Sequence, residues 1–168
     1  MGARQLLAGS LVLVLAGCAP SGLGPLVVDG PELHSSLVTL KLEDAARFHI
    51  APVLRDNPYL STDSAFVDVL ARIASQGRLD GGQGVRAALY ALYLGESEVG
   101  LYGLEAASPA DADRIEGVLR AIWAHNARLE RARVHRGGRV LVVAWNNGVS
   151  PECWEAVNAG VLKRLNVR

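Results

Sequence analysis

Apolar residues recur at two different spacings in the C-terminal half of the chain, and the change of spacing marks the expected elements. Ile115, Leu119 and Ile122 lie three to four residues apart, which is typical of one face of a helix. Gly137-Gly138 separates two runs of strand-forming residues, as in a β-hairpin. We predict a strand over 98–106, a helix from 109 to about 128, a hairpin of strands over 131–136 and 139–145, and a helix from 151.

The N-terminal half gives a less regular pattern. Alternation of apolar and polar residues predicts a strand over 37–42. Ser61-Thr62 precedes an amphipathic run, and together they predict a helix over 62–76. Residues 85–94 (VRAALYALYL) are apolar on every side, so we predict a helix buried between layers.

These elements indicate one α+β domain over residues 33–168, with helices packed on a mixed or antiparallel sheet. The second hairpin strand is almost entirely apolar, so we expect it to be central in the sheet. Residues 19–32 contain three prolines and three glycines. Such a composition is typical of a linker, and we predict a flexible tether over 18–32 in front of the domain.

Composition narrows the class of protein. Apolar residues make up 50% and charged residues 20% of the 168-residue chain, which excludes a chain that is disordered throughout. The 17 basic side chains balance 17 acidic ones, so we expect no nucleic-acid partner that depends on a broad basic surface. Two cysteines are too few for a disulfide-dense scaffold.

The first 17 residues differ in character from the rest of the chain. Arg4 and the terminal amine precede an apolar run from Gln5 to Leu15, which is the charge order of a secretory signal peptide. The run is shorter than the stretch of about 20 residues that spans a bilayer, so we expect residues 1–17 to be a signal peptide.

The apolar run ends in Leu15-Ala16-Gly17-Cys18. This tetrapeptide resembles the lipobox of bacterial lipoproteins at all four positions. The resemblance implies that a peptidase cuts between Gly17 and Cys18, and that acyl chains on Cys18 anchor the mature protein to a membrane. Each buried methylene contributes about 0.8 kcal/mol, so two or three acyl chains hold a domain firmly on a bilayer.

The same resemblance implies a location in the cell envelope, outside the cytoplasm. Ala19 is not acidic, and an acidic residue at this position commonly marks inner-membrane retention in Gram-negative lipoproteins, so outer-membrane sorting stays open. Once Cys18 is acylated, Cys153 has no partner within its own chain. We interpret Cys153 as a buried structural thiol; the alternative is a reactive thiol activated by a helix N-terminus.

Arginines concentrate around the predicted hairpin. We predict that four of them share a face and form a basic contact patch for anionic lipid or an envelope protein partner: Arg131, Arg133, Arg136 and Arg139. The alternative is that these charges only discourage edge-to-edge pairing of strands.

Trp145, Asn146 and Asn147 end the second hairpin strand. An indole beside amide groups is typical of a rim that binds sugar or peptidoglycan, because the ring stacks on the apolar face of a sugar. We favour the other interpretation, in which this ring packs in the core or between helix and sheet, as we also expect for Trp123 and Trp154.

The sequence contains no recognisable catalytic, cofactor or metal motif. Four histidines are scattered without the close spacing of zinc ligands: His34, His49, His125 and His135. The Gly81-Gly82-Gln83-Gly84 run precedes a predicted helix but lacks the lysine of a phosphate loop. Three acidic residues cluster around one predicted strand: Glu96, Glu98 and Glu105. We name no catalytic residue and expect neither a cofactor nor a metal.

These observations favour a lipid-anchored cell-envelope protein that acts as a non-enzymatic binding or assembly module. One alternative is a carrier of lipid or another small ligand, with a pocket built around four aromatic residues: Tyr90, Tyr93, Trp123 and Trp145. The other alternative is an envelope hydrolase, which needs two carboxylates that converge on a cleft.

Overall fold

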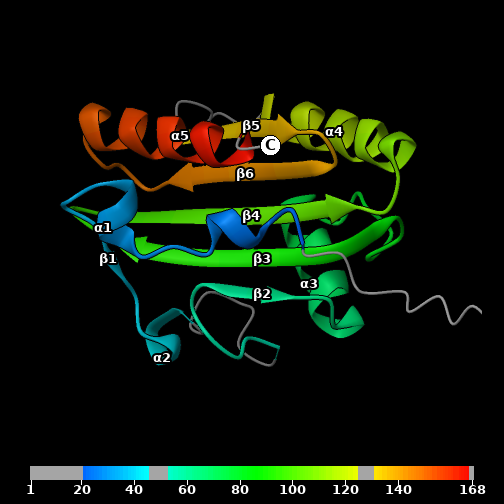
Figure 1. The fold of residues 1–168 in the computed structure, drawn as a ribbon, viewed down its shortest axis with the longest axis horizontal. Helices are drawn as coiled ribbons and strands as arrows, with labels where there is room; N and C mark the ends of the chain where they lie inside the picture. Colours follow the sequence, from blue (N-terminus) through cyan, green and yellow to red (C-terminus); the bar gives the residue numbers. More distant parts are fainter. Residues whose placement is uncertain (1–20, 46–52, 125–130, 167–168) are drawn as a thin grey trace, which may run out of the picture.

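The structure is a computed structural model that describes residues 21–45, 53–124 and 131–166 (Figure 1). Its centre is a six-stranded antiparallel sheet of order β1-β3-β4-β6-β5, in which β2 also pairs with β3. The α+β prediction is therefore confirmed. The strands are β1 (Val38–Thr39), β2 (Tyr59–Ser61), β3 (Val85–Leu94), β4 (Glu98–Ala106), β5 (Ala132–Gly137) and β6 (Val140–Asn146).

Helices cover both faces of the sheet (Figure 1). The helical elements are η1 (Gly24–Leu26), α1 (Gly30–Leu33), α2 (Leu42–Ala45), α3 (Ser64–Ala74), α4 (Pro109–Ala124) and α5 (Pro151–Leu165). α3 and α4 bury one face, while α5, η1 and α1 bury the other, so the sheet separates two apolar clusters. No helix within the described residues is long and apolar enough to cross a membrane.

The largest difference from the predicted elements is β3, because residues 85–94 form a strand and not a helix. Even-numbered residues from 88 to 92 pack toward α3, and odd-numbered residues from 87 to 93 pack toward the opposite cluster. A strand covered on both faces has a continuous apolar sequence, which periodicity alone does not distinguish from a buried helix.

Most other predicted elements are confirmed with small changes at their ends. β1 covers only two residues of the strand predicted over 37–42. α3 begins after Asp63, whose carboxylate accepts a hydrogen bond from the Phe66 N–H, so the cap predicted at Ser61-Thr62 is wrong. β6 lies between β4 and β5, as expected for a central strand. The predicted end of α4 near residue 128 lies outside the described residues.

Residues 21–33, which we call the N-terminal strap, belong to the folded domain. This corrects the tether predicted over 18–32 for all the residues of it that the structure describes. Leu23 and Leu26 are buried, and the Tyr93 hydroxyl donates a hydrogen bond to the Val28 carbonyl at 3.0 Å. Leu23 reaches the sheet at Gly103, where an added Cβ would lie 2.7 Å from the leucine Cδ2.

Candidate functional site

A pocket opens at the end of the sheet where β6 finishes, on the face that α3 and α4 cover. Its volume is ≈ 290 Å³, near the lower end of the range of about 300–1,000 Å³ for small-molecule sites. We call it the aromatic–amide pocket after its lining residues: Gln76, Tyr102, Trp123, Arg131, Ala132, Trp145, Asn146 and Asn147.

Aromatic rings from three neighbouring strands form a row that ends in this pocket. The ring centroids of Tyr90 and Tyr102 are 6.1 Å apart, and those of Tyr102 and Trp145 are 5.9 Å apart. Gly100 pairs with Trp145 across β4 and β6, and a Cβ on Gly100 would lie 2.2 Å from the indole. The indole therefore occupies strand surface that only a glycine leaves free.

The helical wall of the pocket is fixed by a hydrogen bond between α4 and α3. The Trp123 Nε1–H donates to the Ala74 carbonyl at 3.0 Å. Gln76 follows two residues later with a φ of 49°, in the left-handed region that often ends a helix. The Trp123 ring and the Gln76 side chain therefore reach the pocket from well-defined helix ends.

The amide rim is held by contacts within the turn after β6. The Asn146 Oδ1 accepts a hydrogen bond from the Gly148 N–H at 2.8 Å. The Asn147 Nδ2 donates to the Glu98 Oε2 at 3.1 Å, and this bond helps to hold the pKa of the Glu98 carboxyl below its usual range. Glu98 is thus ionised at neutral pH and orients one amide of the rim.

The pocket combines neutral hydrogen-bonding groups with one positive charge. Burial raises the pKa of Tyr102 to about 12, so its phenol stays protonated at neutral pH. Arg131 is exposed and has no acidic partner among the residues that the structure describes. The described lining residues include no carboxylate, histidine or cysteine.

The four arginines of the predicted basic patch divide: Arg131 and Arg133 line one hollow, whereas Arg136 and Arg139 have their contacts elsewhere. Neighbouring arginine positions on β5 alternate between faces, so Arg133 packs toward α5 and Arg136 toward α4. The Arg133 guanidinium pairs with Glu155 and lies 5.7 Å from the ring centroid of Trp154. Arg131 lines the aromatic–amide pocket and also a neighbouring hollow that it shares with Arg133.

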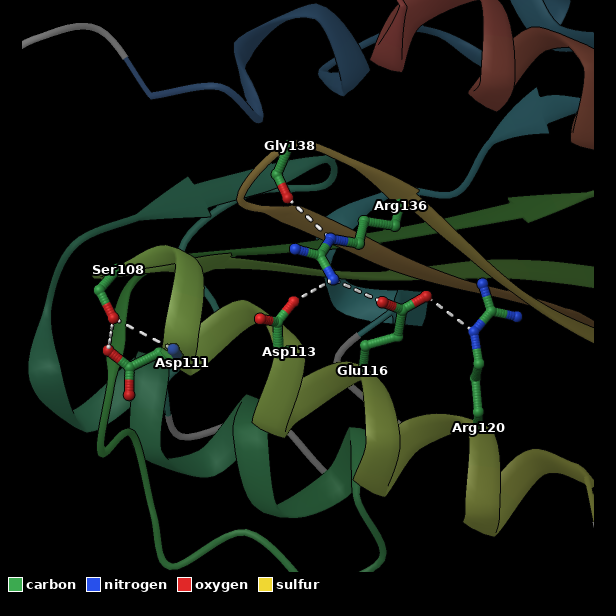
Figure 2. Close-up of polar contacts among 7 residues, drawn as sticks. All are labelled: Ser108, Asp111, Asp113, Glu116, Arg120, Arg136 and Gly138. Atoms are coloured by element: carbon green, nitrogen blue, oxygen red, sulfur yellow. Dashed lines mark hydrogen bonds and ion pairs between the residues drawn. The ribbon is translucent and has the colours of Figure 1, made fainter.

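Arg136 is neutralised on the α4 side, as Figure 2 shows. Its Nη1 bonds to Asp113 at 2.7 Å and to Glu116 at 2.6 Å, and its Nε donates to the Gly138 carbonyl. These contacts lower the pKa of Glu116, which also bonds Arg120. Arg139 lies at the far end of the hairpin and donates to the Ala107 carbonyl. Arg131 and Arg133 therefore share a surface, while Arg136 bonds to α4; contact of these residues with lipid or a protein partner stays a prediction.

The other residues singled out from the sequence do not converge. Glu98 and Glu105 lie at opposite ends of β4. The Gly82 N–H donates to the Asp68 carboxylate, and the glycine run leads into β3 rather than a helix, so the chain's own carboxylate occupies that loop. Among the described residues, no group of three potential metal ligands is present. His49, His125, Gly17 and Cys18 lie outside the described residues.

Three further residues singled out from the sequence lie outside the pocket: Cys153, His34 and His135. Cys153 is buried, and burial raises the pKa of its thiol, which agrees with a structural thiol and not with the reactive alternative. His34 lies at the end of α1, and His135 is buried beneath α5 with its Nε2 2.7 Å from the Asn158 Oδ1.

Part of the pocket could be predicted from the sequence, which singles out residues at both of its walls. It named Trp123, Trp145 and the two asparagines, but Tyr93 lies on the opposite face of the sheet. It missed Gln76 and Tyr102. Tyr102 is separated from Gly100 by one residue on a strand, and this period of two is the signal that places it beside Trp145.

Comparison of the chain with protein-family models, with curated proteins and with solved structures gave no match.

Proposed function

We propose that this protein is a lipid-anchored module of the cell envelope that binds a glycan in the aromatic–amide pocket without catalysing a reaction. The observation that carries the proposal is the arrangement of half-buried indoles beside amide groups: Trp123 and Trp145 with Gln76, Asn146 and Asn147. The anchoring rests on the resemblance of Leu15–Cys18 to a lipobox.

Sugar chemistry fits this set of groups. The C–H face of a pyranose ring stacks on an indole, and its hydroxyls both donate and accept hydrogen bonds. Amides supply a donor and an acceptor on one side chain, and the Tyr102 phenol adds another pair. The Asn146 amide and the Asn147 Nδ2 already bond within the protein, so the Gln76 amide and the Asn147 Oδ1 are the amide groups left for a sugar. Arg131 adds a guanidinium, which favours a glycan that carries a carboxylate.

Muropeptides combine these features, because their sugars carry a lactyl group and a peptide with free carboxylates. A hydrolase would instead need acids at the cleavage point. The described lining residues include no aspartate or glutamate. The rings, amides and guanidinium that are present suit binding of a glycan.

Isothermal titration of the full-length protein in detergent with soluble disaccharide–tetrapeptide muropeptides tests the proposal. Arg131→Ala should weaken binding by about 10- to 100-fold, as expected for a lost charged hydrogen bond of about 1.5–3 kcal/mol. Arg139→Ala is the matched control, because Arg139 lies at the other end of the hairpin. Its affinity should equal that of the unmodified protein. Absence of binding, or equal losses in both variants, contradicts the proposal.

A further inference from the structure

The first residues that the structure describes bond to a buried carboxylate at one end of the sheet. Glu105 on β4 is 1% exposed. Its Oε2 accepts hydrogen bonds from the Ser21 hydroxyl at 2.6 Å and from the Gly22 N–H at 3.0 Å, and its Oε1 pairs with Arg86. Burial alone would raise the pKa of Glu105, but these bonds outweigh burial and hold the pKa below its usual range. An ionised carboxylate therefore fixes Ser21.

The strap continues from this point as a packed segment. Leu23 fits over Gly103, and Leu26 and Leu33 are buried between the sheet and α5. Figure 1 shows the strap running from one end of β4 toward the other end, where α1 lies. The domain thus has little freedom to move relative to Ser21.

Only Ala19 and Pro20 separate Cys18 from Ser21. Three residue steps span at most about 10 Å, since a fully extended chain advances about 3.3–3.6 Å per residue. An acyl anchor on Cys18 is therefore confined to the neighbourhood of Ser21, and the standoff that a flexible tether would give is lost.

We infer that the domain rests on phospholipid headgroups with the sheet end that holds Ser21, and that the aromatic–amide pocket faces away from the bilayer. This inference rests on the lipid anchoring of the proposed function. The charge available to headgroups at this end is Arg139 in the hairpin turn, which has no acidic partner among the described residues, whereas Arg86 is paired with Glu105. Guanidinium groups bind headgroup phosphates well.

The register of the sheet gives the separation between anchor and pocket. Glu105 pairs with Val140, and Gly100 pairs with Trp145. Five residues along β6 correspond to about 17 Å. The pocket is consequently displaced toward the periplasmic or external space, where a polymeric glycan has access to it.

Energy transfer to an acceptor dye on the headgroups tests this orientation. Donor dyes are attached through an encoded azide amino acid at Gln83 or at Glu96, two exposed positions in the turns at opposite ends of β3. The acylated protein is placed in vesicles of phosphatidylethanolamine and phosphatidylglycerol. Transfer from position 83 should exceed transfer from position 96 by at least about twofold, because the positions differ in height by about 30 Å.

A flexible glycine–serine insertion between Pro20 and Ser21 is the matched control, and it should abolish the difference between the two dyes. Equal transfer from both positions in the uninserted protein, or higher transfer from position 96, overturns the inference. Intact mass of the protein reports the acyl chains on Cys18 separately. If they are missing, the anchoring proposal fails, and the orientation is then tested by coupling the Cys18 thiol to a maleimide lipid.

Discussion

Single residues in this protein show why burial and hydrogen bonding have to be considered together. Trp154 is 5% exposed beneath the Arg133 guanidinium, yet its buried Nε1–H has no partner among the described residues. The ring therefore stabilises the fold by its apolar area rather than by its polar atom. The sequence predicted a core position for Trp154. It could not predict that Nε1–H lacks a hydrogen-bond partner, because this depends on how α5 packs against β5.

Trp154→Ala should lower the free energy of unfolding by about 3–5 kcal/mol, as for other buried aromatic residues. Trp154→Phe should cost much less, because no hydrogen bond is lost. Urea denaturation of both variants measures the difference. An unchanged midpoint in the alanine variant would show that the ring is not buried.

His135 makes the stability of the protein depend on pH. Burial, followed by the charges of Arg133 and Arg120, lowers the pKa of His135 below its usual value of 6.5. Below pH 6.5 the unfolded chain therefore binds more protons than the native state, and stability falls as the pH decreases.

The contribution of His135 is isolated by comparing unfolding midpoints at pH 7 and pH 5. Replacement by glutamine should reduce the loss of stability at pH 5 relative to the unmodified protein. His34→Gln is the control. It also replaces a histidine, but one at the end of α1 that is not buried, so the loss of stability at pH 5 should be unchanged. Identical pH dependence of all three proteins would refute the role of His135.

At the scale of elements, the sequence predicted the type of every helix and strand that the structure describes after residue 97, with ends that agree within a few residues where they are described. Caps and turns there are local: Ser150 caps α5, and Gly138 has a positive φ in the hairpin turn. β3 was mistaken for a helix because its partner β4 and its covering helices determine its state. Such contacts are not visible in a run of ten apolar residues.

The strap was missed for a related reason. Its prolines and glycines are typical of linkers, but the leucines between them fill a groove that exists only after the sheet has formed. Two residues that hold the strap on the sheet are distant in sequence, since Glu105 lies 84 residues after Ser21 and Gly103 lies on the same strand. Local composition therefore gave the wrong prediction for this segment.

Gly103→Ala should destabilise the protein by about 1–3 kcal/mol, because the added methyl overlaps Leu23 and Leu89. Gly117→Ala in α4 is the control: a Cβ there meets nothing within 4 Å, so stability should rise by about 1 kcal/mol. Hydrogen exchange should accelerate over residues 21–33 only in the first variant. Normal protection of that segment would contradict its docking at Gly103.

For the whole molecule, the proposed anchor on Cys18 and the aromatic–amide pocket are associated with opposite ends of one sheet. Cys18→Ala removes the acyl acceptor, so the variant should accumulate as an unprocessed precursor without incorporated fatty acid. Metabolic labelling with an alkyne fatty acid and intact mass measure both properties. Normal cleavage and labelling of this variant would refute the lipobox prediction.

The fold class could be predicted from the sequence, because alternation and helical spacing are local properties. Four of the eight residues that line the pocket were also singled out for a pocket or a sugar-binding rim: Trp123, Trp145, Asn146 and Asn147. The side-by-side placement of Tyr102, Trp123 and Trp145 could not be predicted, since it depends on strand order and on a glycine opposite an indole. The division of the predicted arginine patch could not be predicted for the same reason, because Arg133 pairs with Glu155 on α5 and Arg136 with Asp113 on α4.

The central claim, a glycan site between two indoles, is tested most directly by the indole N–H signals in a nitrogen–proton NMR spectrum. The chain has three tryptophans, so the spectrum contains its own control. Titration with soluble muropeptides should shift the signals of Trp123 and Trp145 and leave that of Trp154 unchanged. No shift at millimolar ligand, or an equal shift of all three signals, would contradict the account.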